Sequence, residues 1–113
     1  MRRLIHALFL LTPLAIALPA RADDAATLKL FKTQCSTCHG LDGKGQTTAG
    51  KKVGVKDWTD PKILKPLSEA DVVKAISTGK KGNDGKELMA PFAKLGEDKI
   101  KALAAYIRAF QPK

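Results

Sequence analysis

The sequence predicts an all-α domain that follows an N-terminal leader. Apolar residues recur at spacings of three and four near both ends of the domain, and no segment shows the alternating pattern of a half-buried strand. Long glycine-rich segments separate the predicted helices, and loops of that length in a small domain usually have a function. A single domain is expected, because a chain of about 90 residues forms one core at most.

Residues 1–22 have the three-part layout of a secretory signal peptide. Two arginines precede an apolar run over 4–18, and Ala20-Arg21-Ala22 places small residues where a signal peptidase cleaves. We expect cleavage before Asp23, which leaves 23–113 as the mature domain with no stable membrane insertion. Retention as a membrane anchor is the alternative, although the run is at the lower limit of the ~20 residues that cross a bilayer.

The mature domain is basic. Removing the three leader arginines from 20 basic residues leaves 17 against 11 acidic ones, so the net charge falls from +9 to +6. Every remaining basic residue except Arg108 is a lysine, a point charge suited to diffuse electrostatic steering. Nucleic-acid binders usually add arginine forks and aromatic stacking platforms. The composition therefore favours an acidic protein partner and argues against nucleic acid.

The first and last predicted helices have the clearest periodicity. Asp23 or Asp24 can cap the first helix, and the last runs from about Glu97 to Phe110 with acidic residues in its first turn. The residues expected on the inner faces are Leu28, Phe31 and Cys35 in the first helix, and Ile100, Leu103, Ile107 and Phe110 in the last.

Two shorter helices are predicted between them. An Asp-Pro pair at 60–61 opens a short helical turn. A capping box at Ser68-Glu69-Ala70-Asp71 starts a helix that ends at Thr78. The glycine-rich segments 41–55 and 80–86 lack periodicity and are predicted as loops.

The segment Cys35-Ser36-Thr37-Cys38-His39 carries the strongest functional signal. It has the spacing of a c-type haem attachment site, and it contains both cysteines and the only histidine outside the leader. Two thiols three residues apart on a helical turn can add to the two vinyl groups of a haem, and the next residue then presents its imidazole to the iron. We therefore expect one covalent haem c on Cys35 and Cys38, with His39 as an iron ligand.

Met89 is the candidate for the second axial ligand. It is the only methionine outside the leader, and it lies 50 residues beyond His39. A methionine beside Leu88 and Phe92 would ordinarily be core packing. With a haem in the domain, a loop that holds Met89 can cover the far face of the iron, and His/Met coordination tends to raise the reduction potential.

Two other uses of these cysteines fit the sequence less well. A thioredoxin-like redox pair stands at the start of a helix after a strand, and no strand-helix-strand pattern is present. A structural zinc site needs four ligands, whereas only Cys35, Cys38 and His39 are available without carboxylates.

The mature chain resembles class I c-type cytochromes, the small soluble monohaem proteins, along nearly its full length. The resemblance implies a cytochrome c fold, with three main helices and a short one around a covalent haem and with the first and last helices crossing. The family often has a proline after the haem histidine whose carbonyl orients the imidazole, but none lies between His39 and Pro61. The matching segments are Cys35-Ser36-Thr37-Cys38-His39-Gly40, Asp42-Gly43-Lys44-Gly45, Met89 with Pro91-Phe92, and Leu103-Ala104-Ala105-Tyr106-Ile107.

The resemblance also implies electron transfer, so we expect a monomeric periplasmic electron carrier and not an enzyme. The alternatives are a haem c subunit of a larger oxidoreductase and a ligand-binding haem protein in which Met89 leaves the iron. An apolar haem envelope is expected from Phe31, Trp58, Leu64, Leu67, Ile76, Leu88, Phe92, Leu103 and Ile107. Seven lysines are expected to border the haem edge, where they either dock acidic patches of redox partners or are simply solvated. They are Lys44, Lys51, Lys52, Lys56, Lys80, Lys81 and Lys86.

Overall fold

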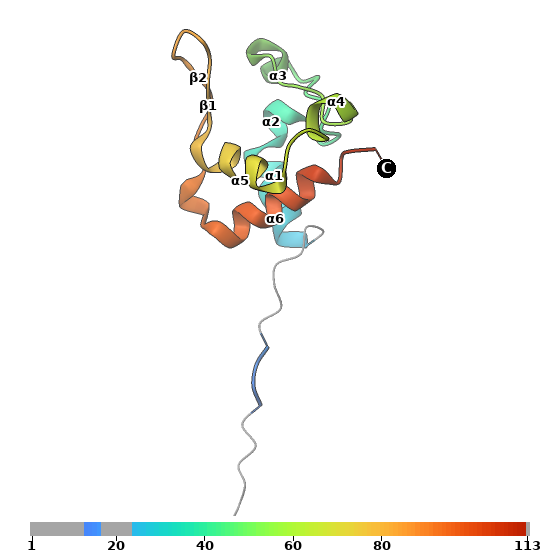
Figure 1. Cartoon of the computed structure of the whole chain (residues 1–113), viewed down its shortest axis with the longest axis vertical. Helices are drawn as coiled ribbons and strands as arrows, with labels where there is room; N and C mark the ends of the chain where they lie inside the picture. Colours follow the sequence, from blue (N-terminus) through green and yellow to red (C-terminus); the bar gives the residue numbers. More distant parts are fainter. Residues whose placement is uncertain (1–12, 17–23, 113) are drawn as a thin grey trace, which may run out of the picture.

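A computed structural model describes residues 13–16 and 24–112 (Figure 1). The predicted cleavage site before Asp23 lies outside the described residues. Among the helices that the structure describes, none is both long and apolar enough to cross a bilayer. The elements are α1 (Ala25–Gln34), α2 (Ser36–His39), α3 (Thr48–Val53), α4 (Pro61–Leu64), α5 (Glu69–Thr78), β1 (Lys80–Lys81), β2 (Glu87–Met89), a 3₁₀ turn (Ala93–Leu95) and α6 (Glu97–Arg108).

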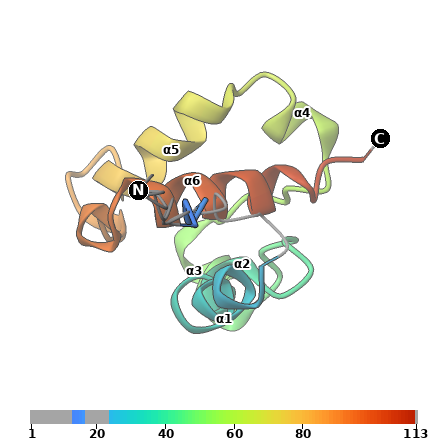
Figure 2. The ribbon, with the colours of Figure 1, turned by 90° about the horizontal axis from the view of Figure 1, so that it is seen from below.

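Helix α6 is the central element of the domain. Figure 2 shows α6 running across the view between α5 on one side and α1 on the other, with α1 seen nearly end-on. The first and last helices therefore cross, as the resemblance implied. The core lies along these contacts and consists of Phe31, Leu64, Val72, Ile76, Ile100, Leu103, Ala104 and Ile107.

The predicted helices are present, and their caps explain where they begin. Asp24 accepts a hydrogen bond from the Ala26 backbone N–H at 2.9 Å and so starts α1. At α5, the Asp71 carboxylate accepts from the Ser68 N–H at 2.8 Å and the Ser68 hydroxyl accepts from the Asp71 N–H at 3.1 Å, which completes the predicted capping box. The last helix ends at Arg108, two residues before the predicted end, although Phe110 still packs against the core.

Both segments predicted as loops contain regular structure. Helix α3 lies within 41–55, where the Thr47 hydroxyl accepts from the Gly50 N–H at 2.8 Å and caps it. Segment 80–86 forms most of an antiparallel hairpin in which Lys80 pairs with Met89. Neither was visible as periodicity, because α3 is six residues long and the paired strands have two and three residues.

Truncation of Phe31 should be the most damaging single change in the core. Its side chain is fully buried at the crossing of α1 and α6, with its ring centroid 4.9 Å from that of Tyr106. Phe31→Ala should lower the free energy of unfolding by about 3–5 kcal/mol in denaturant titration of the haem-loaded protein. Leu41→Ala, at a side chain that is 61% exposed, should change it by less than about 0.5 kcal/mol. Similar effects of the two variants would contradict this assignment of the core.

Candidate functional site

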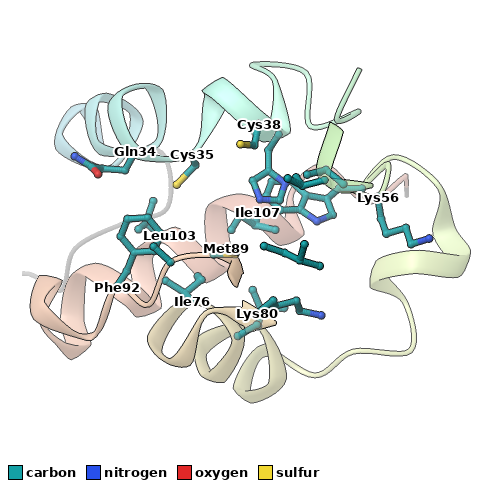
Figure 3. Close-up of a pocket in the computed structure, with 18 of the residues that line it drawn as sticks. Gln34, Cys35, Cys38, Lys56, Ile76, Lys80, Met89, Phe92, Leu103 and Ile107 are labelled. Carbon is teal, nitrogen blue, oxygen red and sulfur yellow. The ribbon is translucent and has the colours of Figure 1, made fainter. Parts of the chain in front are cut away.

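A largely apolar cavity of about 450 Å³ opens between the α1–α2 turn, α5, α6 and the hairpin (Figure 3). This volume lies within the range of about 300–1,000 Å³ that is typical of cofactor pockets. The structure brings Cys35, Cys38, His39 and Met89, which the sequence singled out, to the walls of this one cavity. Of the residues predicted to form the haem envelope, all but one line this cavity: Trp58, Leu64, Leu67, Ile76, Leu88, Phe92, Leu103 and Ile107. The exception is Phe31, which is fully buried in the core.

The two cysteines are placed by the end of α1. The Cys35 N–H still donates to the Phe31 carbonyl at 2.9 Å, and the His39 N–H donates to the Cys35 carbonyl at 3.0 Å, so the chain makes one more helical turn, α2. Figure 3 shows the Cys35 and Cys38 thiols side by side on one wall of the cavity. Burial raises the pKa of the Cys35 thiol to about 11, which keeps it protonated at neutral pH.

The His39 imidazole lies in the same wall, against Trp58. The two rings stack with centroids 4.0 Å apart and planes at 15°. Burial lowers the pKa of His39 to about 4, so at neutral pH the ring is uncharged, the form that binds metals. Its Nδ1 atom is buried, and no hydrogen-bond partner for it occurs within the described part of the chain.

Helix α3 supports the cysteine turn from behind, a role that the sequence analysis missed. The Thr47 hydroxyl donates to the Cys38 carbonyl at 3.0 Å while it caps α3. A Cβ on Gly50 would overlap the Cys38 carbonyl oxygen, so only glycine lets α3 approach this closely. A threonine three residues before a glycine was the only sequence signal for this contact.

Met89 reaches the cavity from the opposite wall, at the end of β2. Figure 3 shows it beside Ile76 and Lys80 and across the cavity from the cysteines. Gly79, with φ of +70°, turns the chain out of α5, and a Cβ there would overlap the Met89 carbonyl oxygen. The Phe92 N–H then donates to the Ile76 carbonyl at 2.9 Å and ties the far side of Met89 to α5.

Two of the predicted lysines lie at the cavity itself. Lys56 and Lys80 come from opposite walls and line one end of it (Figure 3). We call this pair the rim lysines. The hairpin and α3 extend toward the same end of the domain (Figure 1) and carry further exposed lysines, of which Lys86 lies 3.6 Å from the Asp84 carboxylate.

Comparison with known proteins identifies the family. The family model described as "Cytochrome C oxidase, cbb3-type, subunit III" matches residues 22–107. The chain belongs to this family of c-type cytochromes. As a c-type cytochrome, it carries covalently bound haem c with its iron.

Individual relatives of this cytochrome are of two kinds. The cbb3-type cytochrome c oxidase subunit FixP of Bradyrhizobium sp. (strain ORS 278) is 33% identical over 81% of this chain, but this chain spans only 30% of that subunit. Cytochrome c-553 of Helicobacter pylori is 33% identical over 78% of this chain and 82% of its own length. Among solved structures, the KustC0563 c-type cytochrome is 31% identical, with a TM-score of 0.67 over 76% of this chain and 98% of its own.

The cavity of this cytochrome fits a haem in both shape and chemistry. Its walls are mostly apolar, two cysteines stand on one side, and Met89 stands on the other. The half-buried His39 imidazole also lines the cavity, stacked on Trp58 and with its Nδ1 atom buried. Cysteine, histidine and methionine are the side chains that c-type haem sites use.

Thr47→Val should show how much α3 contributes to the cysteine turn. The change keeps the shape of the side chain but removes the hydroxyl that serves both Cys38 and Gly50, so denaturant unfolding should show a loss of about 1–2 kcal/mol. Thr33→Val is the matched control, because the exposed Thr33 hydroxyl bonds only to carbonyls of its own helix. Equal effects of the two variants would show that the contact with Cys38 contributes nothing.

Proposed function

We propose that this cytochrome is a monomeric periplasmic electron carrier with His/Met coordination of its haem iron. In this proposal residues 1–22 are removed on export, and Cys35 and Cys38 hold the haem through thioether bonds. His39 and Met89 are the two axial ligands. No catalytic acid, base or nucleophile is required, because electron transfer makes and breaks no substrate bonds.

One observation supports this proposal above all others: Met89 and the cysteine turn line opposite walls of one apolar cavity. Each wall is held independently, the first by Thr47 and Gly50 and the second by Gly79. Ligands fixed on both sides would change position little between two oxidation states. A small change in geometry is what rapid single-electron transfer needs.

The haem supplies an iron that accepts or releases one electron, and the chain tunes it. Leu64 and Leu103 line the cavity and are each only 1% exposed, and Ile76, which also lines it, is 5% exposed. Apolar walls of this kind disfavour the more highly charged oxidised state, and thioether ligation acts in the same direction. The residues around the cavity therefore favour a raised reduction potential.

The visible spectrum tests the ligand assignment. The wild-type protein should show a c-type pyridine haemochrome and the weak far-red ferric band of a sulfur–iron bond. Met89→Leu should keep the covalent haem but lose the band and bind carbon monoxide rapidly when reduced. Leu88→Ala, at the neighbouring residue of the same cavity, should retain the band. If Met89→Leu keeps the band, or if the wild-type protein lacks it, Met89 is not the ligand. Rapid carbon monoxide binding by the wild-type protein would favour a ligand-binding haem protein.

We further propose that the rim lysines guide acidic patches of redox partners to the haem. Lys56 and Lys80 flank one end of the cavity from two different segments of the chain, so their charges converge there. In this proposal the exposed edge of the haem would face the same end. Charges arranged in this way accelerate encounter more than they strengthen the final complex.

Reversal of both rim charges should slow the reaction with a negatively charged oxidant. With ferricyanide as the probe, Lys56→Glu/Lys80→Glu should lower the stopped-flow rate constant by about tenfold or more at low salt, and the difference should shrink as salt screens the charges. Lys29→Glu/Lys99→Glu carries the same charge change in a separate groove between α1 and α6. An equal slowing in that control would mean that net charge, and not its position at the rim, controls the rate.

A haem c subunit of a larger oxidoreductase is the second candidate, and the similarity to FixP favours it. The similarity to cytochrome c-553, which this chain matches over most of that protein's length, favours the free carrier. Gel filtration of an extract from the native cells separates the two. A haem peak at the mass of the mature chain supports the carrier, whereas elution with a large membrane complex supports the subunit.

A further inference from the structure

The orientation of the His39 ring has an unusual basis in this structure. A histidine that binds a metal almost always donates its other ring N–H to a carbonyl, a carboxylate or water, and that bond fixes the plane of the ring. Here the buried Nδ1 of His39 has no such partner among the residues that the structure describes. What contacts the ring is the face of the Trp58 indole, stacked 4.0 Å away at 15°.

Trp58 is itself held firmly. Its backbone N–H donates to the Gly43 carbonyl at 2.9 Å, which joins it to the loop just after His39. Its ring packs on Phe31 with centroids 6.3 Å apart and on Phe110 with centroids 5.9 Å apart. Phe31 is fully buried at the crossing of α1 and α6, so the indole is braced by the best-packed part of the core.

We propose that Trp58 is a positioning residue that fixes the plane of the His39 ring by face-to-face stacking, in the role that a hydrogen bond donated by the Nδ1 N–H usually has. The inference rests on the proposed function, in which His39 is an axial ligand of the iron. A flat contact over the whole ring prevents rotation about the bond that joins the imidazole to its side chain. It also keeps water from that face of the ring.

Loss of the stack has two measurable consequences. The His39 plane becomes free to take several orientations, which changes the principal g values of the ferric electron paramagnetic resonance signal or broadens them. Water also gains access to the imidazole, and the more polar surroundings favour the oxidised state, so the reduction potential falls.

The test compares three variants of the haem-loaded protein. Trp58→Leu removes the flat face and keeps an apolar side chain, whereas Trp58→Phe keeps an aromatic face. Phe110→Leu is the matched control, because Phe110 packs on Trp58, Phe31 and Tyr106 but is not among the residues lining the cavity. Each variant is measured by ferric resonance spectrum, reduction potential and thermal unfolding.

Trp58→Leu should change the g values and lower the potential, and Trp58→Phe should largely restore both. Phe110→Leu removes one contact of the indole but keeps its stack on His39, so it should lower the unfolding temperature and shift the g values and the potential much less. Unchanged g values and potential in Trp58→Leu, or equal shifts in Phe110→Leu, would overturn the proposal and leave Trp58 as core packing. If Trp58→Leu fails to retain haem, Trp58→Ile replaces it with the same expected outcomes. A wild-type ferric spectrum without low-spin His/Met features would instead refute the proposed ligation, and the inference with it.

Discussion

The packing of α1 against α6 around Phe31 is the contact on which the rest of the domain depends. Phe31 accepts the last helical hydrogen bond before the cysteine turn, contacts Tyr106 of α6 and braces Trp58. Its ring therefore anchors the last turn of α1, from which the cysteine turn continues, to α6. The site is built outward from this one side chain, although Phe31 itself does not line the cavity.

The sequence predicted those parts of the structure that have local causes. Helices α1, α5 and α6 were predicted because each combines an apolar face with polar or acidic residues in its cap or first turn, and the Ser68–Asp71 capping box needs only residues three apart. Cys35, Cys38 and His39 were singled out as candidates in the same way, through their spacing, and they line one cavity. Met89 was identified by exclusion, as the only methionine beyond the leader, and the structure places it on the same cavity.

The parts that were missed depend on contacts between distant segments. Helix α3 exists because Gly50 can lie against the Cys38 carbonyl, and no periodic pattern encodes that approach. The hairpin is held by two short strands with a register irregularity, too brief to alternate visibly. The stack of Trp58 on His39 depends on how the whole segment between these two residues folds, so no local sequence pattern predicts it.

The position of Phe31 also has a consequence for the order of assembly. Its partners Tyr106 and Phe110 lie almost at the other end of the domain, so the core contact that orients the cysteines is of very long range in the sequence. Closing a loop of this length costs conformational entropy before the contact between the two helices contributes to stability. Until that contact forms, the cysteine turn continues from a first helix that has no core to pack against, and the direction in which its two thiols face is not yet fixed.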